Sequence, residues 1–108
     1  MIGLCLGSLQ YPQWSAFIAQ WQARGARMMV YLNPLLRNVS SIAGLKHYYY
    51  EEAYAKGYFV LDAAGDVFIS YAGAAMIDLT NPEARAFMQR LIVENVLALG
   101  VSGWMAGV

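Results

Sequence analysis

Carboxyl groups are the side chains in this sequence that could carry chemistry, because a suitably spaced pair can supply a nucleophile or base together with an acid. Asp78 precedes a predicted helix, where its carboxylate can either react or accept backbone N–H bonds, and the second interpretation is favoured. Asp62 and Asp66 flank a predicted turn, where such residues satisfy the local backbone. Glu51 and Glu52 are interpreted as the solvated face of a helix rather than an acid/base pair.

Metal and cofactor chemistry is not indicated. The sequence contains one cysteine, Cys5, and one histidine, His47. A disulfide within the chain and a histidine- or cysteine-based metal cluster are therefore not expected. His47 has no evident carboxylate or cysteine partner and is interpreted as a loop histidine. We expect no cofactor.

The clearest elements that could position these residues are two helices. The first is predicted from Pro12 to Arg24, with Gly25 as its stop signal. Its apolar side chains recur at the spacing of one helical face: Trp14, Phe17, Ile18 and Trp21. The second is predicted from Pro82 through to Gly100, with Asn81 as N-cap and Pro82 at the first helical position.

Two short apolar runs follow these helices. Residues 27–32 and 101–106 are nearly continuous in apolar side chains, which is typical of parallel strands buried on both faces. Between them, residues 35–48 carry loop signals, and a short helix is predicted from Tyr49 to Lys56. A strand–turn–strand pattern then spans residues 58–71 and predicts an inserted hairpin.

Alternating helices and apolar strands predict an α/β fold with a parallel sheet. In such folds the chemistry lies at the carboxyl ends of the strands. The two predicted strands end at Asn33-Pro34 and at Gly107.

The composition is unusually apolar for a free-standing domain. Charged residues make up 13% of the chain and apolar residues 59%, whereas average domains are about a quarter charged. Much of this apolar surface is therefore expected to contact other protein. The net charge is zero and no basic run exists, so neither a nucleic acid nor a membrane surface is an expected partner. Neither a membrane span nor a convincing signal peptide is evident, and the compartment stays open.

Several stretches resemble glycoside hydrolase family 31, the retaining α-glycosidases built on a (β/α)8 barrel. The resemblance runs from about residue 11 to residue 106. It rests on the order and spacing of several stretches taken together. They are Trp21 with Gly25, Tyr31-Leu-Asn-Pro34, Glu51-Glu-Ala53 with Gly57-Tyr58 and Asp62, Ile77-Asp-Leu-Thr-Asn-Pro-Glu-Ala84 and Gly103-Trp-Met-Ala106. Within the family they are most similar to the branch that includes sulfoquinovosidases.

This resemblance implies that residues 1–108 are a fragment of a catalytic (β/α)8 barrel, with about two of its strands and an inserted β-hairpin. A retaining glycosidase hydrolyses O-glycosidic bonds with two carboxyl groups roughly 5 Å apart. The family nucleophile directly follows the equivalent of Gly103-Trp-Met-Ala106, where this sequence has Gly107. Glycine cannot form the covalent intermediate. The family acid/base residue is expected beyond residue 108, so no catalytic residue is assigned and the chain alone is expected to be inactive.

Sugar contacts are assigned by the same resemblance. Trp104 and Met105 lie where the family's substrate pocket is, and both could pack against a sugar ring or fill a barrel core. Asn33 could bind a sugar hydroxyl or merely end its strand. Residues 48–50, three tyrosines, could form an aromatic platform, although packing between elements is the simpler interpretation.

Two further interpretations stay open beside a fragment of an active α-glycosidase. The chain could be a non-catalytic short product that binds a protein partner, such as the full-length enzyme, through its exposed apolar barrel faces. It could also be a sugar-binding pseudoenzyme. The isolated chain is expected to be aggregated or molten, because parallel strands need cover on both faces. Aggregation would count against the partner-binding interpretation.

Overall fold

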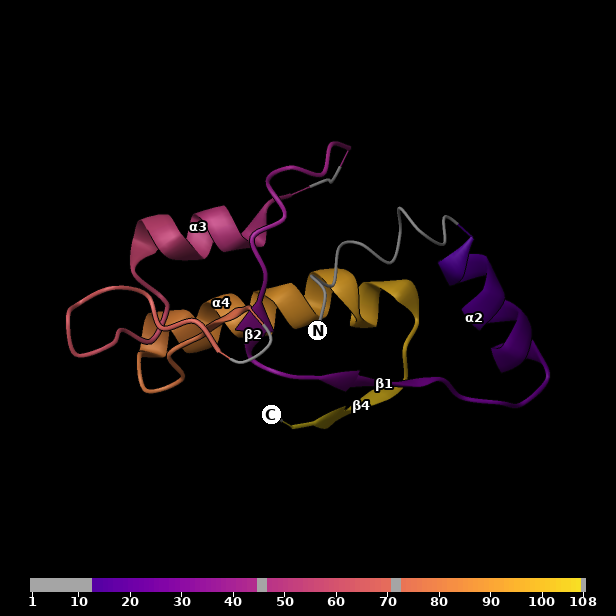
Figure 1. Cartoon of the computed structure of the whole chain (residues 1–108). Helices are drawn as coiled ribbons and strands as arrows, with labels where there is room; N and C mark the ends of the chain where they lie inside the picture. Colours follow the sequence, from indigo (N-terminus) through magenta and orange to yellow (C-terminus); the bar gives the residue numbers. More distant parts are fainter. Residues whose placement is uncertain (1–12, 45–46, 71–72, 108) are drawn as a thin grey trace.

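A computed structural model describes residues 13–44, 47–70 and 73–107. Helices and strands are interspersed along the chain, and Figure 1 labels most of them. They are α2 (Trp14–Ala23), β1 (Met29–Leu32), β2 (Leu35–Leu36), α3 (Tyr49–Lys56), β3 (Ala75–Met76), α4 (Pro82–Asn95), the 3₁₀ helix η1 (Leu97–Leu99) and β4 (Gly103–Ala106).

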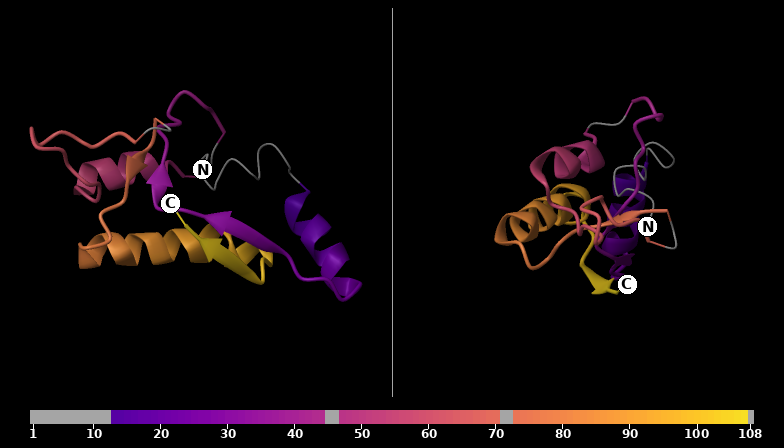
Figure 2. Two further views of the ribbon diagram at one scale, coloured as in Figure 1. Left: turned by 60° about the horizontal axis from the view of Figure 1, so that its bottom comes forward. Right: turned by 60° about the vertical axis from the view of Figure 1, so that its left-hand side comes forward.

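The first and last strands form a parallel pair. Met29 is opposite Gly103 and Leu32 is opposite Ala106, and the Gly107 N–H donates to the Leu32 carbonyl over 3.0 Å. Figure 2 shows the two arrows side by side and pointing the same way, with α4 as part of the connection between them. The predicted α/β fold with about two barrel strands is confirmed, and no closed barrel is formed by the described residues.

The two faces of the β1–β4 pair differ. Val30 and Leu32 point to the side where α2, α4 and η1 supply a small core that includes Ile18, Val96 and Val101. On the opposite side, which we call the open face, Met29, Tyr31 and Met105 are 67%, 47% and 62% exposed. The prediction that both strands are buried on both faces is therefore wrong for this chain. Helices cover one face, and none of the described residues covers the other.

The segment between β1 and α4 forms a second core. The prediction of a loop over residues 35–48 is wrong at its start, because Leu35 and Leu36 form β2 and pair antiparallel with β3. Both leucines are buried, and this burial favours the strand. The loop signals in the sequence around them do not predict it. This core joins α3, α4 and the strands between them: Leu36, Tyr49, Ala53, Tyr58, Phe59, Ala75, Ile77, Ala84, Phe87 and Leu91.

The predicted hairpin is present in a loose form. Leu61 and Val67 form an isolated antiparallel bridge, and the Phe68 N–H donates to the Val60 carbonyl. The Asp62 carboxylate accepts N–H bonds from Ala64 and Asp66 and so closes the turn. The predicted end of the second strand, Tyr71, lies outside the described residues.

Local capping signals position the helices. Helix α3 spans the predicted residues and ends at Gly57, whose φ of 71° is left-handed. Helix α4 begins at Pro82, and the Asn81 side chain accepts the Glu83 N–H over 2.9 Å, so the predicted cap is confirmed. Pro12, the predicted start of the first helix, lies outside the described residues. Of its predicted apolar face only Ile18 is buried, whereas Phe17 and Trp21 are each 42% exposed.

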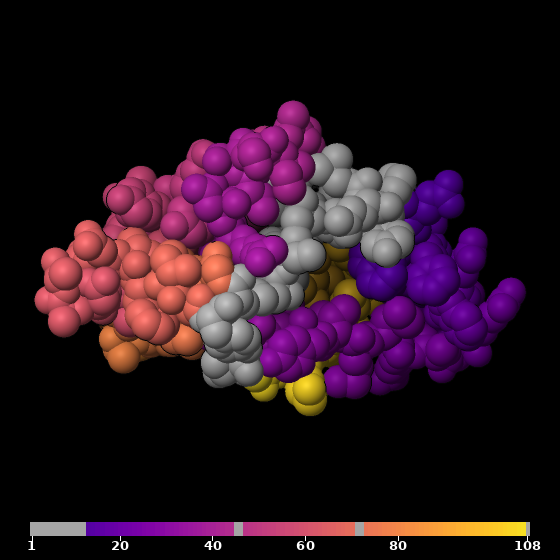
Figure 3. Space-filling view, viewed as in Figure 1, coloured from indigo at the N-terminus to yellow at the C-terminus, as the bar shows by residue number. Residues whose placement is uncertain are grey.

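The chain is extended for its size. Its radius of gyration is 14.8 Å, whereas a compact domain of this length has roughly 13 Å. It exposes 6849 Å², against roughly 6,000 Å² expected for a compact monomer of this mass. Helix α2 and the hairpin lie at opposite ends (Figure 3). None of the helices within the described ranges is long and apolar enough to cross a membrane.

Candidate active site

The carboxyl ends of β1 and β4 lie side by side. Asn33 follows Leu32 directly, and Gly107 follows Ala106, its partner in the register. The backbone bond from Gly107 to Leu32 extends the parallel pairing to this edge. The edge that the sequence singles out for chemistry is therefore formed, although it carries no carboxyl group on either strand end.

A side chain at position 107 would point toward the open face. Alternation along β4 places residues 103, 105 and 107 on one side, and in the register these share the side of Met29 and Tyr31. A Cβ built on Gly107 would lie 2.7 Å from the Tyr31 hydroxyl and 2.9 Å from a carbon of its ring. Tyr31 thus occupies the space into which any side chain at position 107 would extend.

The same alternation separates two of the three predicted sugar-contacting residues. Met105 shares the open face with Tyr31, whereas Trp104 is in register with Val30 on the helix-covered side. Of Trp104 and Met105, only Met105 therefore points to the same face as a side chain at position 107 would. Substrate contacts by Trp104, Met105 and Asn33 stay a prediction.

Two of the acidic residues singled out in the sequence, Asp78 and Asp62, shape turns. Asp78 Oδ1 accepts both the backbone N–H of Thr80, over 3.0 Å, and its hydroxyl, over 2.6 Å. These bonds from Thr80 hold the pKa of Asp78 below its usual value. Asp62 closes the hairpin turn in a similar way. The turn-forming interpretation of both residues accounts for all of these bonds.

Glu52 lies at the centre of a polar cluster that sequence reasoning missed. Its side chain is only 15% exposed, and it accepts bonds of 2.6 Å from Arg90 and His47, with Lys56 Nζ at 3.5 Å. The interpretations of Glu52 as part of a solvated face and of His47 as a residue without a carboxylate partner are therefore wrong. The reason is tertiary, because α4 packs on α3 and brings Arg90 over Glu52.

The charges of this cluster change its pKa values. Burial alone raises the pKa of Glu52, but the bonds from Arg90 and His47 and the positive charges of Arg90 and Lys56 outweigh it and lower the pKa overall. The Glu52 carboxylate in turn raises the pKa of Arg90. Nearby, the Tyr49 hydroxyl donates to the Glu94 carboxylate over 2.5 Å, and the Asn95 amide donates to the Tyr49 hydroxyl oxygen over 2.8 Å. The network joins α3 to α4, which indicates a structural role.

The three consecutive tyrosines pack between elements, as their simpler interpretation predicts. Tyr49 is buried against Phe87, with ring centroids 6.2 Å apart, and the Tyr48 hydroxyl donates to the Ile42 carbonyl. Tyr50 lies against Phe59 at 5.0 Å. Within the described part of the chain, no group of three or more His, Cys, Asp and Glu side chains could hold a metal ion.

The chain is similar to known proteins over nearly its whole length, including β1 and β4. Residues 6–107 match the family of glycosyl hydrolases family 31 TIM-barrel domains. The sulfoquinovosidases of Escherichia coli (strain K12) and Agrobacterium fabrum are 35% and 32% identical to the chain over 92% and 90% of its length. In each case the chain spans 14% of the relative.

Solved structures give the same result for the fold. A family 31 sulfoquinovosidase from E. rectale, in complex with an aza-sugar inhibitor, is 33% identical and superposes with a TM-score of 0.75 over 92% of the chain and 14% of that protein. An α-xylosidase from a soil metagenome, in complex with xylose, superposes with a TM-score of 0.72 at 21% identity, over 96% of the chain and 15% of that protein, which supports the fold. The chain belongs to glycoside hydrolase family 31, within its TIM-barrel domain.

Proposed function

We propose that this chain is a segment of a retaining α-glycosidase barrel that acts on O-glycosidic bonds in carbohydrates and that it is inactive as it stands. The observation that carries the proposal is Gly107, at the end of β4 and on the open face. A retaining mechanism needs a nucleophilic carboxylate and an acid/base carboxyl group roughly 5 Å apart. The described strand ends carry Asn33 and Gly107 and offer neither group.

We expect the substrate to be a carbohydrate α-glycoside. The family match and the sulfoquinovosidase relatives support a carbohydrate as the substrate class. Met105 is proposed to line the sugar site from the open face. Trp104 is proposed to support the same strand end from the helix side, and Asn33 to contact a sugar hydroxyl at the neighbouring strand end.

The test is a chimeric enzyme in which residues 6–107 replace the matching segment of the E. coli sulfoquinovosidase. The host then supplies the rest of the barrel. We expect the chimera to be inactive toward a chromogenic α-sulfoquinovoside, and Gly107→Asp to raise kcat/KM by at least about a thousandfold, because it restores a nucleophile. The half-exposed Tyr31 ring must turn aside to admit the new side chain.

Gly107→Asn is the matched control, since it adds the same volume without a carboxylate. The proposal fails if the unmodified chimera already turns over substrate. It fails equally if Gly107→Asp yields a folded protein, by circular dichroism and gel filtration, that stays as inactive as Gly107→Asn.

One observation favours a second candidate function, a non-catalytic chain that binds a protein partner. The open face presents Met29, Tyr31 and Met105 to solvent, and an exposed apolar patch is typical of an interaction site. Co-expression with the full-length E. coli sulfoquinovosidase should then give a soluble complex of fixed stoichiometry by light scattering. Met105→Lys should abolish it, and Glu83→Gln, a change far from the open face, should not.

A further inference from the structure

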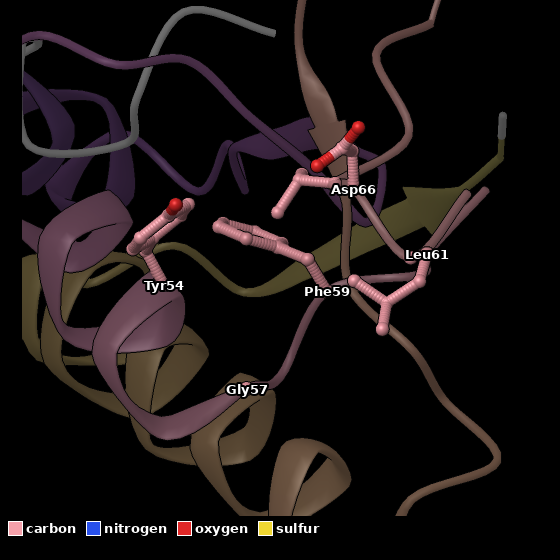
Figure 4. Close-up of a pocket in the computed structure, with 7 residues that line it drawn as sticks. Tyr54, Gly57, Phe59, Leu61 and Asp66 are labelled. Atoms are coloured by element: carbon pink, nitrogen blue, oxygen red, sulfur yellow. The ribbon is translucent and has the colours of Figure 1, made fainter.

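A pocket opens between the end of α3 and the hairpin. Its volume is about 260 Å³, and its lining includes Tyr54, Phe59, Leu61, Asp66 and Val67. Figure 4 shows the labelled side chains around it, with the rings of Tyr54 and Phe59 on one side and the Asp66 carboxylate on another. Ligand pockets for drug-sized molecules span roughly 300–1,000 Å³, so this one suits a single small ring.

The aromatic wall of the pocket is braced from behind. Tyr50 stacks on Tyr54 with centroids 6.3 Å apart and planes at 19°, and its ring also contacts Phe59. Phe59 is buried, whereas Tyr54 is 61% exposed. One face of the Tyr54 ring is therefore held by Tyr50, and the ring forms a preorganised apolar surface at the edge of the pocket.

The polar side of the pocket accepts hydrogen bonds. Asp62 closes the hairpin turn, since its carboxylate binds the N–H groups of Ala64 and Asp66. The Asp66 carboxylate is exposed, and among the described residues it has no hydrogen-bond or ion-pair partner. The C-terminal end of α3, at Gly57, also lines the pocket and adds the negative end of a helix dipole. Among the described residues that line the pocket there is no Lys or Arg.

We propose that this pocket binds a neutral sugar ring. The ligand needs hydroxyl donors for Asp66 and an apolar C–H face for Tyr54 and Leu61. It must carry no negative charge, because the charged side chain among the described lining residues, Asp66, is itself an acid. The choice of a sugar rests on the proposed function, whereas the acceptor character and the size come from the pocket itself.

Isothermal titration with methyl α-glucoside tests this on the full 108-residue chain and, in parallel, on the chimera with Gly107 retained, so that no turnover interferes. We expect a Kd in the millimolar range. Asp66→Asn should weaken binding about tenfold, since a charge-assisted bond is lost. Tyr54→Ala should weaken it roughly three- to tenfold through loss of the ring contact.

The controls are Glu83→Gln, for an exposed carboxylate elsewhere, and Phe68→Ala, for an exposed hairpin ring outside the pocket; both should leave the Kd unchanged. If the isolated chain does not fold, the chimera decides. The proposal is overturned if neither pocket variant changes the Kd in the chimera, or if methyl glucuronide or choline binds more tightly than the glucoside. The Gly107→Asp activity assay reports separately on the proposed function, so the two can fail independently.

Discussion

Glu52 connects three parts of the chain through one carboxylate. His47 precedes α3, Lys56 lies on α3 and Arg90 lies on α4, and all three side chains contact Glu52. A mostly buried carboxylate is costly unless cations and donors surround it. Here they do, and the result is a lowered pKa for Glu52 in the fold. Acid should therefore weaken the contact between α3 and α4.

The pH dependence has a definite sign. Because the folded pKa of Glu52 lies below its ordinary value of 4.5, its contribution to stability is complete above that pH and is lost as the pH falls through the lower, folded value. In the chimera, the difference in urea midpoint between wild type and Glu52→Gln should be largest at pH 7 and should shrink toward pH 3. Glu51→Gln, an exposed neighbour on the same helix, should show no such trend. A Glu52→Gln difference that is constant from pH 7 to pH 3 would contradict the assignment.

At this scale the sequence was informative only where partners are local. The bonds of Asp62 and Asp78 reach two to four residues ahead, which turn chemistry predicts. Arg90 reaches Glu52 across 38 residues of chain. No pattern in a single sequence encodes that contact. For this reason the prediction of a solvated face for Glu52 is wrong.

Helix α4 is the element that organises the chain. It contributes Ala84, Phe87 and Leu91 to the core with α3, and Ile92 packs against the core beneath β1 and β4. Its start is specified locally by Asn81 and Pro82, while its length is maintained by burial in both cores. The local signals made α3 and the start of α4 predictable from sequence. The predicted end of the second helix at Gly100 is wrong, because α4 ends at Asn95 and residues 97–99 form the separate η1. The two-residue strand β2 could not be predicted, because its pairing with β3 depends on a distant segment.

Loss of the cap should therefore be measurable. Asn81→Ala removes the acceptor for the Glu83 N–H and should lower the free energy of unfolding by about 1 kcal/mol. Asn81→Ser keeps an acceptor and should cost much less. Urea unfolding of the chimera is the measurement. Equal destabilisation by the two variants would show that the Asn81 side chain acts through some other contact.

At the scale of the whole molecule, none of the described residues covers the open face. A two-stranded sheet is marginal by itself, and this one leaves Met29, Tyr31 and Met105 exposed while the chain as a whole exceeds the surface of a compact monomer. The low charge content of the sequence predicts such exposed apolar surface. Which face is open could not be predicted, because both strands consist of nearly continuous apolar residues.

The isolated 108-residue chain should consequently be molten or aggregated. We expect helical far-ultraviolet circular dichroism without a near-ultraviolet signal, strong binding of a hydrophobic dye and no cooperative thermal transition. The chimera, whose host strands can cover the open face, should melt cooperatively. A sharp melt and dispersed NMR signals from the chain alone would show that its two small cores suffice.

The approach of Tyr31 to Gly107 makes the two positions evolutionarily interdependent. Two of the four glycine codons become aspartate codons by a single-base change, but the new Cβ would lie 2.7 Å from the Tyr31 hydroxyl and 2.9 Å from a carbon of its ring. The effect of a change to aspartate therefore depends on how freely residue 31 can turn aside. A smaller residue at position 31 would accommodate the aspartate more easily. Epistasis of this kind predicts that, among homologues, the identity of residue 31 covaries with that of residue 107.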